Sequence, residues 1–296
     1  MNSLLAKKIE AGDFIITAEY LPGTDINKIP IDQLKRSGAM AVNVADNPYG
    51  PIISSLASAV KLQQADIEPV LQIITRDRNR IALQSDILGA AALGITNILC
   101  LSGYHQSLTD SPEAANVYDI DSIQLIESVN KMKTDKVLLN GKKIDGQFSV
   151  LVGAVANPYL RPLDLNIMRL MKKVKAGANF IQTQAVFNTT DFKEWLDAAY
   201  KEGLTEKAAI IAGIYPLAGY NEAISLLDRH TDFYIPDSHV KRIQDAGSPE
   251  EQKKMGIAIC VETINKIKGM KGLSGIHIIS GNKEDIISEI VTDAGL

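Results

Sequence analysis

One acidic side chain interrupts the first apolar run of the sequence. Glu19 follows the segment Phe14-Ile-Ile-Thr-Ala and precedes Tyr20. A carboxyl group at the end of a buried strand is partly desolvated, which raises its pKa above the ordinary value of about 4.3. Such a group can act as a general acid near neutral pH. From position alone, a glutamate paired with an arginine or a loop amide is the stronger interpretation, and a catalytic acid is the alternative.

Two amide side chains lie two residues apart in a later apolar run. Alternate residues of a strand share a face, so we expect Gln182 and Gln184 to point the same way, with Thr183 opposed. A carboxamide carries both donors and an acceptor, which suits the edge of a heterocycle. A polar layer that satisfies its own hydrogen bonds inside the fold is an equally good interpretation.

Three arginines occupy alternate positions at the start of a predicted helix. Arg76, Arg78 and Arg80 could bind an anion such as a cofactor phosphate at the helix N-terminus. For at least two of them, a solvated turn paired with Asp77 and Asp86 is the stronger interpretation. The four histidines show no spacing typical of metal ligands, so no metal site is expected. One of them lies in a predicted strand and is interpreted as a core or hydrogen-bonded residue.

The elements that must position these residues follow a regular alternation. Short runs rich in Val and Ile are followed by longer segments of helical periodicity. The predicted strands are residues 14–20, 41–45, 69–74, 97–101, 149–155, 180–186, 209–214 and 276–280. The predicted helices are residues 31–37, 54–64, 80–93, 121–133, 164–176, 190–202, 220–229 and 284–294.

Eight β/α units predict an α/β protein with a closed (β/α)₈ TIM barrel. The near-continuous apolar strands are typical of parallel strands covered on both faces. An open, doubly wound sheet is the alternative, but the turn after the first strand lacks the Gly-x-Gly-x-x-Gly pattern of dinucleotide-binding domains. We expect a single domain over residues 1–296, with a long polar loop at 102–120. A second interruption at 231–271 is predicted to contain a loop and an extra helix near 252–268.

Composition excludes several classes of protein. The 296 residues are 46% hydrophobic and carry 31 Lys and Arg against 35 Asp and Glu, a net charge of −4. This balance argues against a nucleic-acid partner. Both cysteines, Cys100 and Cys260, lie in apolar runs, which suits a reducing compartment. With no apolar run near the roughly 18 residues of a membrane span, and no signal-like N-terminus, we expect a cytoplasmic protein.

Three segments resemble those of one enzyme family. Thr17-Ala-Glu-Tyr-Leu-Pro22 is similar to the family's Phe-Glu-Phe-Phe-Pro-Pro segment, and Gly213-Ile-Tyr-Pro216 matches its Gly-Ile-x-Pro turn. The segment 172–184 contains Ala-Gly-Ala at 176–178 and Thr-Gln at 183–184. It is similar to the family's signature Lys-x-x-Ala-Gly-Ala-x-x-x-x-Thr-Gln. In order and over essentially its whole length, the chain resembles methylenetetrahydrofolate reductase, a flavin-dependent (β/α)₈ barrel.

The resemblance implies roles for individual residues. Glu19 falls on the catalytic glutamate, which protonates the folate nitrogen so that the five-membered ring opens and accepts hydride from reduced flavin. Gln184 falls on a folate-binding glutamine, and Tyr220 where an aromatic ring stacks on the substrate. Lys173 falls on a flavin-contacting lysine. The expected substrate-binding residues are Gln182, Gln184, Tyr220 and Lys283, and the expected cofactor-binding residues are Asn43, Asp46, Gln72, Ser102, Gly103, Tyr104, Asn157, Lys172 and Lys173.

One position departs from the family pattern. After the fourth strand the family has Gly followed by Asp, whereas this chain has Gly103-Tyr104. Loss of that carboxylate makes the surroundings of a flavin more positive, which favours its reduced, anionic form. The segment from Arg76 to Gln84 is similar to relatives found in anaerobic one-carbon metabolism. Some of these carry FMN in place of FAD, and some work with a second subunit that relays electrons.

The resemblance therefore implies a methylenetetrahydrofolate reductase-like oxidoreductase with FAD, or FMN, as cofactor. It would reduce 5,10-methylenetetrahydrofolate to 5-methyltetrahydrofolate, or run the reverse oxidation, with electrons from NAD(P)H or from a reduced partner subunit. One alternative is a flavin- and folate-binding subunit of a larger methyl-transfer or redox complex, and another is a non-catalytic folate-binding barrel. Assembly into homo- or hetero-oligomers is compatible with each of these functions.

Overall fold

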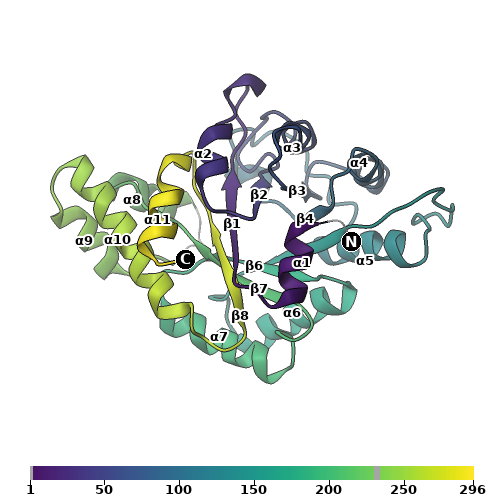
Figure 1. The fold of residues 1–296 in the computed structure, drawn as a ribbon. Coiled ribbons are helices and arrows are strands. Elements are labelled where there is room, and N and C mark those ends of the chain that lie inside the picture. Colours follow the sequence, from purple (N-terminus) through teal and green to yellow (C-terminus); the bar gives the residue numbers. More distant parts are fainter. Residues whose placement is uncertain (1–2, 230–233) are drawn as a thin grey trace.

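Eight parallel strands close into a barrel in the computed structural model, which describes residues 3–229 and 234–296. The strands are β1 (Ile15–Tyr20), β2 (Ala41–Val44), β3 (Pro69–Ile74), β4 (Asn97–Leu101), β5 (Leu151–Ala156), β6 (Phe180–Ala185), β7 (Ala209–Ile214) and β8 (Leu273–Ile278). Each strand pairs with the next in sequence, and β8 pairs with β1, which closes the ring (Figure 1). The predicted TIM barrel is confirmed.

Helices follow the strands and cover the outside of the ring (Figure 1). They are α1 (Leu4–Ala11), α2 (Ile31–Arg36), α3 (Ser55–Gln64), α4 (Arg80–Ala92), α5 (Ser122–Thr134), α6 (Leu163–Ala176), α7 (Thr189–Lys201), α8 (Tyr220–Arg229), α9 (Asp237–Asp245), α10 (Pro249–Ile267) and α11 (Ile287–Asp293). Short 3₁₀ helices occupy 26–28, 106–108 and 284–286. Apolar side chains of the strands and helices, such as Leu62, Ile98 and Trp195, form the main core between the two layers.

The first helix closes the end of the barrel at which the strands begin. Leu5 and Ala6 of α1 pack against residues at the starts of several strands, among them Ile15 and Phe180. Glu68, just before β3, accepts hydrogen bonds from the backbone amides of Leu4 at 2.6 Å and Leu5 at 2.9 Å. A carboxylate at a helix N-terminus satisfies otherwise unpaired amides and complements the helix dipole. The opposite end of the barrel is therefore the one left for a ligand.

The two interruptions of the β/α pattern have different structures. Between β4 and α5, residues 102–121 contain only the 3₁₀ helix Gln106–Leu108. The segment 231–271 includes residues 231–233, which lie outside the described residues. Its remainder holds the expected helix, α10, and also α9, where a loop was predicted. The side chain of Ile243 in α9 is buried and packs in a small cluster with residues of α8 and α10.

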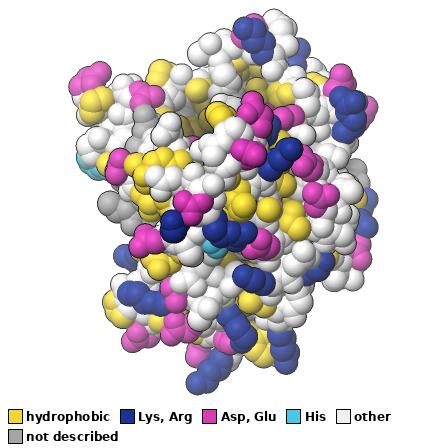
Figure 2. Space-filling view, turned by 90° about the vertical axis from the view of Figure 1, so that its left-hand side faces the viewer, with side chains coloured by type: hydrophobic (Ala, Val, Ile, Leu, Met, Phe, Trp, Pro, Cys, Tyr) yellow, Lys and Arg dark blue, Asp and Glu magenta, His cyan; other side chains and the backbone are white. Residues whose placement is uncertain are grey.

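Charged side chains of both signs occur together on the molecular surface (Figure 2). On the face that Figure 2 shows, acidic and basic side chains are interspersed among the described residues and form no continuous basic area. Nucleic-acid-binding surfaces gather their positive charge in such an area. Across residues 3–229 and 234–296, every helix is too short or too polar to span a bilayer.

Gly153 of β5 packs directly against a buried aromatic ring. A Cβ atom built on Gly153 would lie 2.1 Å from the ring of Phe180 in β6, so this glycine leaves space for the ring. We expect Gly153→Ala to lower the free energy of unfolding by about 1–3 kcal/mol because the ring must shift. Urea unfolding followed by circular dichroism measures the change.

Gly89 of α4 provides the matched control, since a Cβ atom there meets no atom within 4 Å. Gly89→Ala is expected to leave stability unchanged or to raise it by up to about 1 kcal/mol, because alanine favours a helix more than glycine does. If both variants unfold at the wild-type urea concentration, Phe180 does not occupy the space beside Gly153.

Candidate functional site

A cavity of about 530 Å³ opens at the end of the barrel where the strands finish. This volume falls within the range of about 300–1,000 Å³ common for small-molecule sites. Its polar lining residues are Glu19, Asp46, Tyr49, Gln72, Ser102, Tyr104, Ser122, Lys173, Gln182, Thr183, Gln184, Tyr215 and His277. Its remaining walls are apolar side chains and glycines, including Leu21, Ile74, Leu101, Ile279 and Gly103. The carboxyl ends of barrel strands are where active sites of this fold occur.

Glu19, next to last in β1, is held by groups from other elements. Gln72 of β3 donates a hydrogen bond from Nε2 to Glu19 Oε2 at 3.2 Å. The Ser280 hydroxyl, after β8, lies 2.7 Å from the Glu19 backbone oxygen and 3.2 Å from Glu284 Oε1. Burial raises the pKa of Glu19; the hydrogen bond from Gln72 opposes this shift, and the nearby Glu284 carboxyl adds to it. The partner of the Glu19 carboxyl is thus a neutral amide, and the carboxyl group tends to keep its proton.

Gln182 belongs to a buried polar layer across the barrel. Its Nε2 donates to Asn43 Oδ1 at 3.1 Å and to Thr17 Oγ1 at 3.2 Å, while Asn43 Nδ2 donates to Gln182 Oε1 at 2.6 Å. Asn43 stands behind Gln182 and does not line the cavity. Gln184, two residues nearer the strand end, lines the cavity together with Thr183. The structure therefore places Gln182 in the self-satisfied layer and Gln184 at the position better suited to a ligand.

All three arginines of the segment after β3 are paired with carboxylates. Arg76 Nε lies 2.7 Å from Asp77, Arg78 pairs with Asp46 and lies 3.0 Å from Asp86, and Arg80 lies 2.8 Å from Asp119. The salt-bridged turn is thus what the structure shows, and an anion at this turn would have to compete with these carboxylates. Asp46 lines the cavity with its charge already balanced by Arg78.

Arg76 also organises the loop after β4. Its guanidinium donates to the backbone oxygens of Tyr104 at 3.1 Å and Asn47 at 2.6 Å, and its side chain is 2% exposed. Gly103 has φ of 83°, and a Cβ there would lie 3.2 Å from both Ile74 and Arg76. A buried arginine thus fixes the backbone on which Ser102, Gly103 and Tyr104 reach the cavity.

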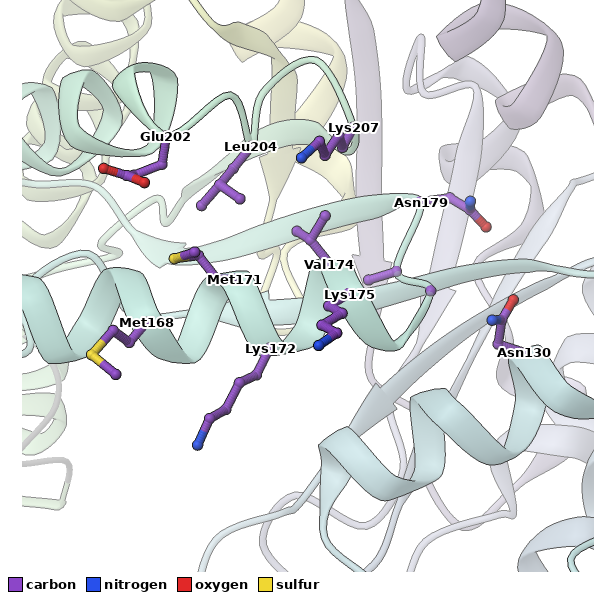
Figure 3. A pocket seen from close by; sticks show the side chains of 12 residues that line it. Asn130, Met168, Met171, Lys172, Val174, Lys175, Asn179, Glu202, Leu204 and Lys207 are labelled. Atoms are coloured by element: carbon purple, nitrogen blue, oxygen red, sulfur yellow. The ribbon is translucent and has the colours of Figure 1, made fainter.

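Two adjacent lysines of α6 have opposite surroundings. Lys173 lines the cavity and donates from Nζ to the Val155 backbone oxygen at 2.5 Å. Burial, with a smaller contribution from Arg169, lowers the pKa of Lys173 to about 8. Lys172 is exposed and borders a separate groove on the outside of the barrel, beside Met168 and Met171 (Figure 3). Successive helical residues point about 100° apart, so α6 brings only Lys173 to the candidate site and the structure does not support Lys172 there.

Three other predicted residues do not line the cavity. Asn157 accepts a hydrogen bond from the Tyr159 backbone amide at 2.9 Å, in the turn after β5. Tyr220 is the first residue of α8, and its backbone amide donates a hydrogen bond to Gln252 of α10. Lys283 Nζ lies 2.7 Å from Glu222 and 4.6 Å from the centre of the Tyr215 ring. Lys283 therefore stands behind Tyr215, which itself forms part of the wall.

Several wall residues were not among the predicted site residues. Tyr49 and Pro48 lie in the loop after β2, and Tyr215 directly follows β7. The rule that sites lie at strand ends selects Tyr215 and could have found it. His277 in β8 sits opposite Thr17 in the pairing of β8 with β1. Alternation along β1 puts Thr17 on the same face as Glu19, which is the signal that could have indicated an inward His277.

Proteins similar in sequence are reductases by name. The family model described as methylenetetrahydrofolate reductase matches residues 4–295. A Caenorhabditis elegans relative, "Probable methylenetetrahydrofolate reductase (NADPH)", is 21% identical over 311 aligned positions, covering 100% of this chain and 44% of its own length. The 5,10-methylenetetrahydrofolate reductase of Buchnera aphidicola (subsp. Schizaphis graminum) is 27% identical, covering 69% of this chain and 72% of that protein. The chain thus spans less than half of the worm relative.

Solved structures with a similar fold extend over nearly the whole chain. An uncharacterized Clostridium thermocellum protein, described as binding two copies of 5-methyl-5,6,7,8-tetrahydrofolic acid, superposes with a TM-score of 0.67 at 17% identity, covering 99% of this chain and 98% of its own. The coenzyme F420-dependent tetrahydromethanopterin reductase of Methanopyrus kandleri has a TM-score of 0.57 at 15% identity, covering 94% and 97%. At these identities the likeness concerns the fold alone, whereas the family model covers residues 4–295 in sequence. The chain belongs to the methylenetetrahydrofolate reductase family.

Proposed function

We propose that the protein binds a reduced folate in this cavity and interconverts 5,10-methylenetetrahydrofolate and 5-methyltetrahydrofolate with a bound flavin. The observation that carries the proposal is the Glu19 carboxyl group, which lines the cavity and whose pKa is raised by burial. Opening the five-membered ring of the folate needs a proton donor at a ring nitrogen. Family membership and the tetrahydrofolate named for the C. thermocellum protein support this choice of substrate.

The cavity residues fit the ring system of a flavin. Lys173 is the one cationic side chain among the described residues that line the cavity, and Gln72 adds an amide. Both can hold carbonyl oxygens or ring nitrogens of an isoalloxazine, and the apolar walls suit its faces. A bound flavin, FAD or FMN, would supply the hydride, while the protein supplies position and electrostatics. The neighbouring arginines are already paired with carboxylates, so the phosphate end of the cofactor would lie outside this group.

The chain's own residues divide the remaining tasks. Glu19 holds the proton at the cavity wall, and Gln72 holds the Glu19 carboxyl by a hydrogen bond to Oε2. Gln184 is positioned to take the donor–acceptor edge of the pterin. Leu21, Ile279 and the Tyr215 ring line the same cavity and would reduce the water around a bound ligand, which would strengthen its polar contacts.

Glu19→Gln tests the acid. The change keeps the shape of the side chain and removes the proton, so we expect methylenetetrahydrofolate-dependent reoxidation of the photoreduced flavoprotein to slow at least about a hundredfold. The affinity for 5-methyltetrahydrofolate should stay within about threefold, because this ligand needs no proton transfer to bind. Stopped-flow absorbance gives the rate, and isothermal titration gives the affinity.

Glu202→Gln, in the exposed outer groove, is the control and should react at the wild-type rate. Wild-type reoxidation by Glu19→Gln with flavin bound would show that Glu19 is not the acid. A protein that binds the folate but neither flavin would instead support a non-catalytic barrel.

Lys173 and Lys172 give a matched pair for the flavin. Because the pKa of Lys173 is lowered to about 8, its charge is present below that pH and is lost as the pH rises through it. Flavin affinity, measured by fluorescence quenching, should therefore fall as the pH rises through about 8. Lys173→Arg should keep binding at higher pH, and Lys173→Met should bind weakly throughout.

Lys172→Met should follow the wild-type profile, because Lys172 faces the outer groove. Equal losses in Lys172→Met and Lys173→Met would indicate that α6 acts by its overall charge rather than through a contact in the cavity.

A partner-dependent role is the second candidate, favoured by Tyr104. This residue lines the cavity at the place where the family typically has an aspartate. Without that carboxylate the flavin environment is more positive, which suits electrons from a carrier of higher potential than NAD(P)H. We expect NADH mixed anaerobically with the purified chain to bleach the flavin slowly, as followed at its visible absorbance maximum. Rapid bleaching by NADH would remove the reason for a partner.

A further inference from the structure

His277 is a buried histidine with one ring nitrogen in a hydrogen bond and the other without one. Its side chain is 3% exposed and contributes to the cavity lining. Nδ1 lies 2.9 Å from Thr17 Oγ1. Within the part of the chain that the structure describes, Nε2 has no hydrogen-bond partner, although the side chain borders the cavity. The hydrogen bonds around Thr17 decide which of these two nitrogens carries the proton.

The amide layer decides the direction of the hydrogen bond between Thr17 and His277. Gln182 Nε2 has two hydrogens, and the structure directs one to Asn43 Oδ1 and the other to Thr17 Oγ1. The Thr17 hydroxyl therefore accepts from Gln182, and its own hydrogen must go elsewhere. Thr17 is fully buried, and His277 Nδ1 is the described acceptor within reach. Leaving a buried hydroxyl hydrogen unpaired is costly, so Thr17 donates to Nδ1.

This direction determines the tautomer of the imidazole. A ring nitrogen that accepts a hydrogen bond carries no hydrogen, so a neutral His277 has its hydrogen on Nε2. Protonation of Nδ1 would set two hydrogens against each other at Thr17. Burial also opposes a second proton on the ring. It lowers the pKa of His277 to about 3, so the ring is neutral across the physiological pH range.

We propose that the hydrogen bonds linking Asn43, Gln182 and Thr17 hold His277 as the Nε2–H tautomer. His277 is then a fixed, neutral hydrogen-bond donor to the ligand in the cavity. The matching group on the ligand is an acceptor without a hydrogen, such as a ring nitrogen or a carbonyl oxygen of a heterocycle. For the identity of that ligand the inference rests on the proposed folate function. The tautomer itself is a property of the protein alone.

Histidine-selective ¹⁵N labelling tests the tautomer in the ligand-free protein. The His277 signals, assigned by their loss in His277→Gln, should show a pyridine-type Nδ1 and a pyrrole-type Nε2 that do not titrate between pH 5 and 8. Thr17→Val removes the donor to Nδ1 and should yield a mixture of tautomers or a ring that titrates. A hydrogen on Nδ1, or a charged ring at pH 6, in the wild-type protein would overturn the inference.

Titration with 5-methyltetrahydrofolate tests the contact. His277→Phe keeps a planar ring without a donor and should bind about tenfold more weakly. His277→Gln can place an amide N–H near the position of Nε2 and should recover most of that loss. His239→Gln, on α9 and outside the cavity lining, is the control and should bind as the wild type does.

These experiments distinguish a wrong His277 contact from a wrong assignment of folate as the ligand. Wild-type affinity in His277→Phe would show that Nε2–H does not contact the folate, and so would overturn the inference while leaving folate binding intact. A wild-type protein that does not bind 5-methyltetrahydrofolate would overturn the proposed function, and the ¹⁵N spectrum would still decide the tautomer.

Discussion

The candidate site depends on the cost of placing a negative charge at the end of β1. The Glu19 carboxyl group is half-buried at the cavity wall, its hydrogen-bond partner is the neutral amide of Gln72, and Glu284 lies close enough to add repulsion. Desolvation and repulsion both favour the protonated form. A free arginine in this cavity would reverse that balance. The structure prevents this, because Arg76, Arg78 and Arg80 are each paired with an aspartate.

A second constraint is the internal layer beneath the cavity. Polar groups inside a barrel are tolerated only when they are paired, and Asn43, Gln182, Thr17 and His277 pair with one another. The layer is neutral, so it adds no charge that would favour ionisation of Glu19. His277 and Gln184 both line the cavity, and neither His277 Nε2 nor Gln184 takes part in the hydrogen bonds of the layer. The same packing therefore suits both the proposed acid and the proposed recognition of a heterocycle.

The barrel was predictable because its strands are short apolar runs at regular spacing, and all eight were anticipated within a few residues. The helix α9 was not, because its sequence is polar and only Ile243 is buried. The arginine turn was anticipated through Asp77 and Asp86, which are near in sequence. Asp46 and Asp119, which pair with Arg78 and Arg80, are distant in sequence, so the local spacing of charges could not predict these two ion pairs.

The site itself was predictable only in part. The strand-end rule and the family resemblance both point to Glu19, and the cavity includes it. The resemblance singles out Lys173, but the predicted set also includes Lys172. Only the rotation of α6 about its axis shows that Lys173 faces the cavity and Lys172 does not. His277 depends on the register between β8 and β1, which is a property of the closed sheet.

Infrared difference spectroscopy tests the central claim most directly. The spectrum of the ligand-free wild-type protein minus that of Glu19→Gln isolates the Glu19 carboxyl group, whose protonated and ionised forms absorb at well-separated frequencies. Because burial raises the pKa of this group, we expect a carboxylic-acid C=O band to persist in the difference spectrum at a pH above about 4.3, the ordinary pKa of an exposed glutamate. A carboxylate band alone at that pH would show that Glu19 is ionised, and that the acid proposed here does not hold its proton.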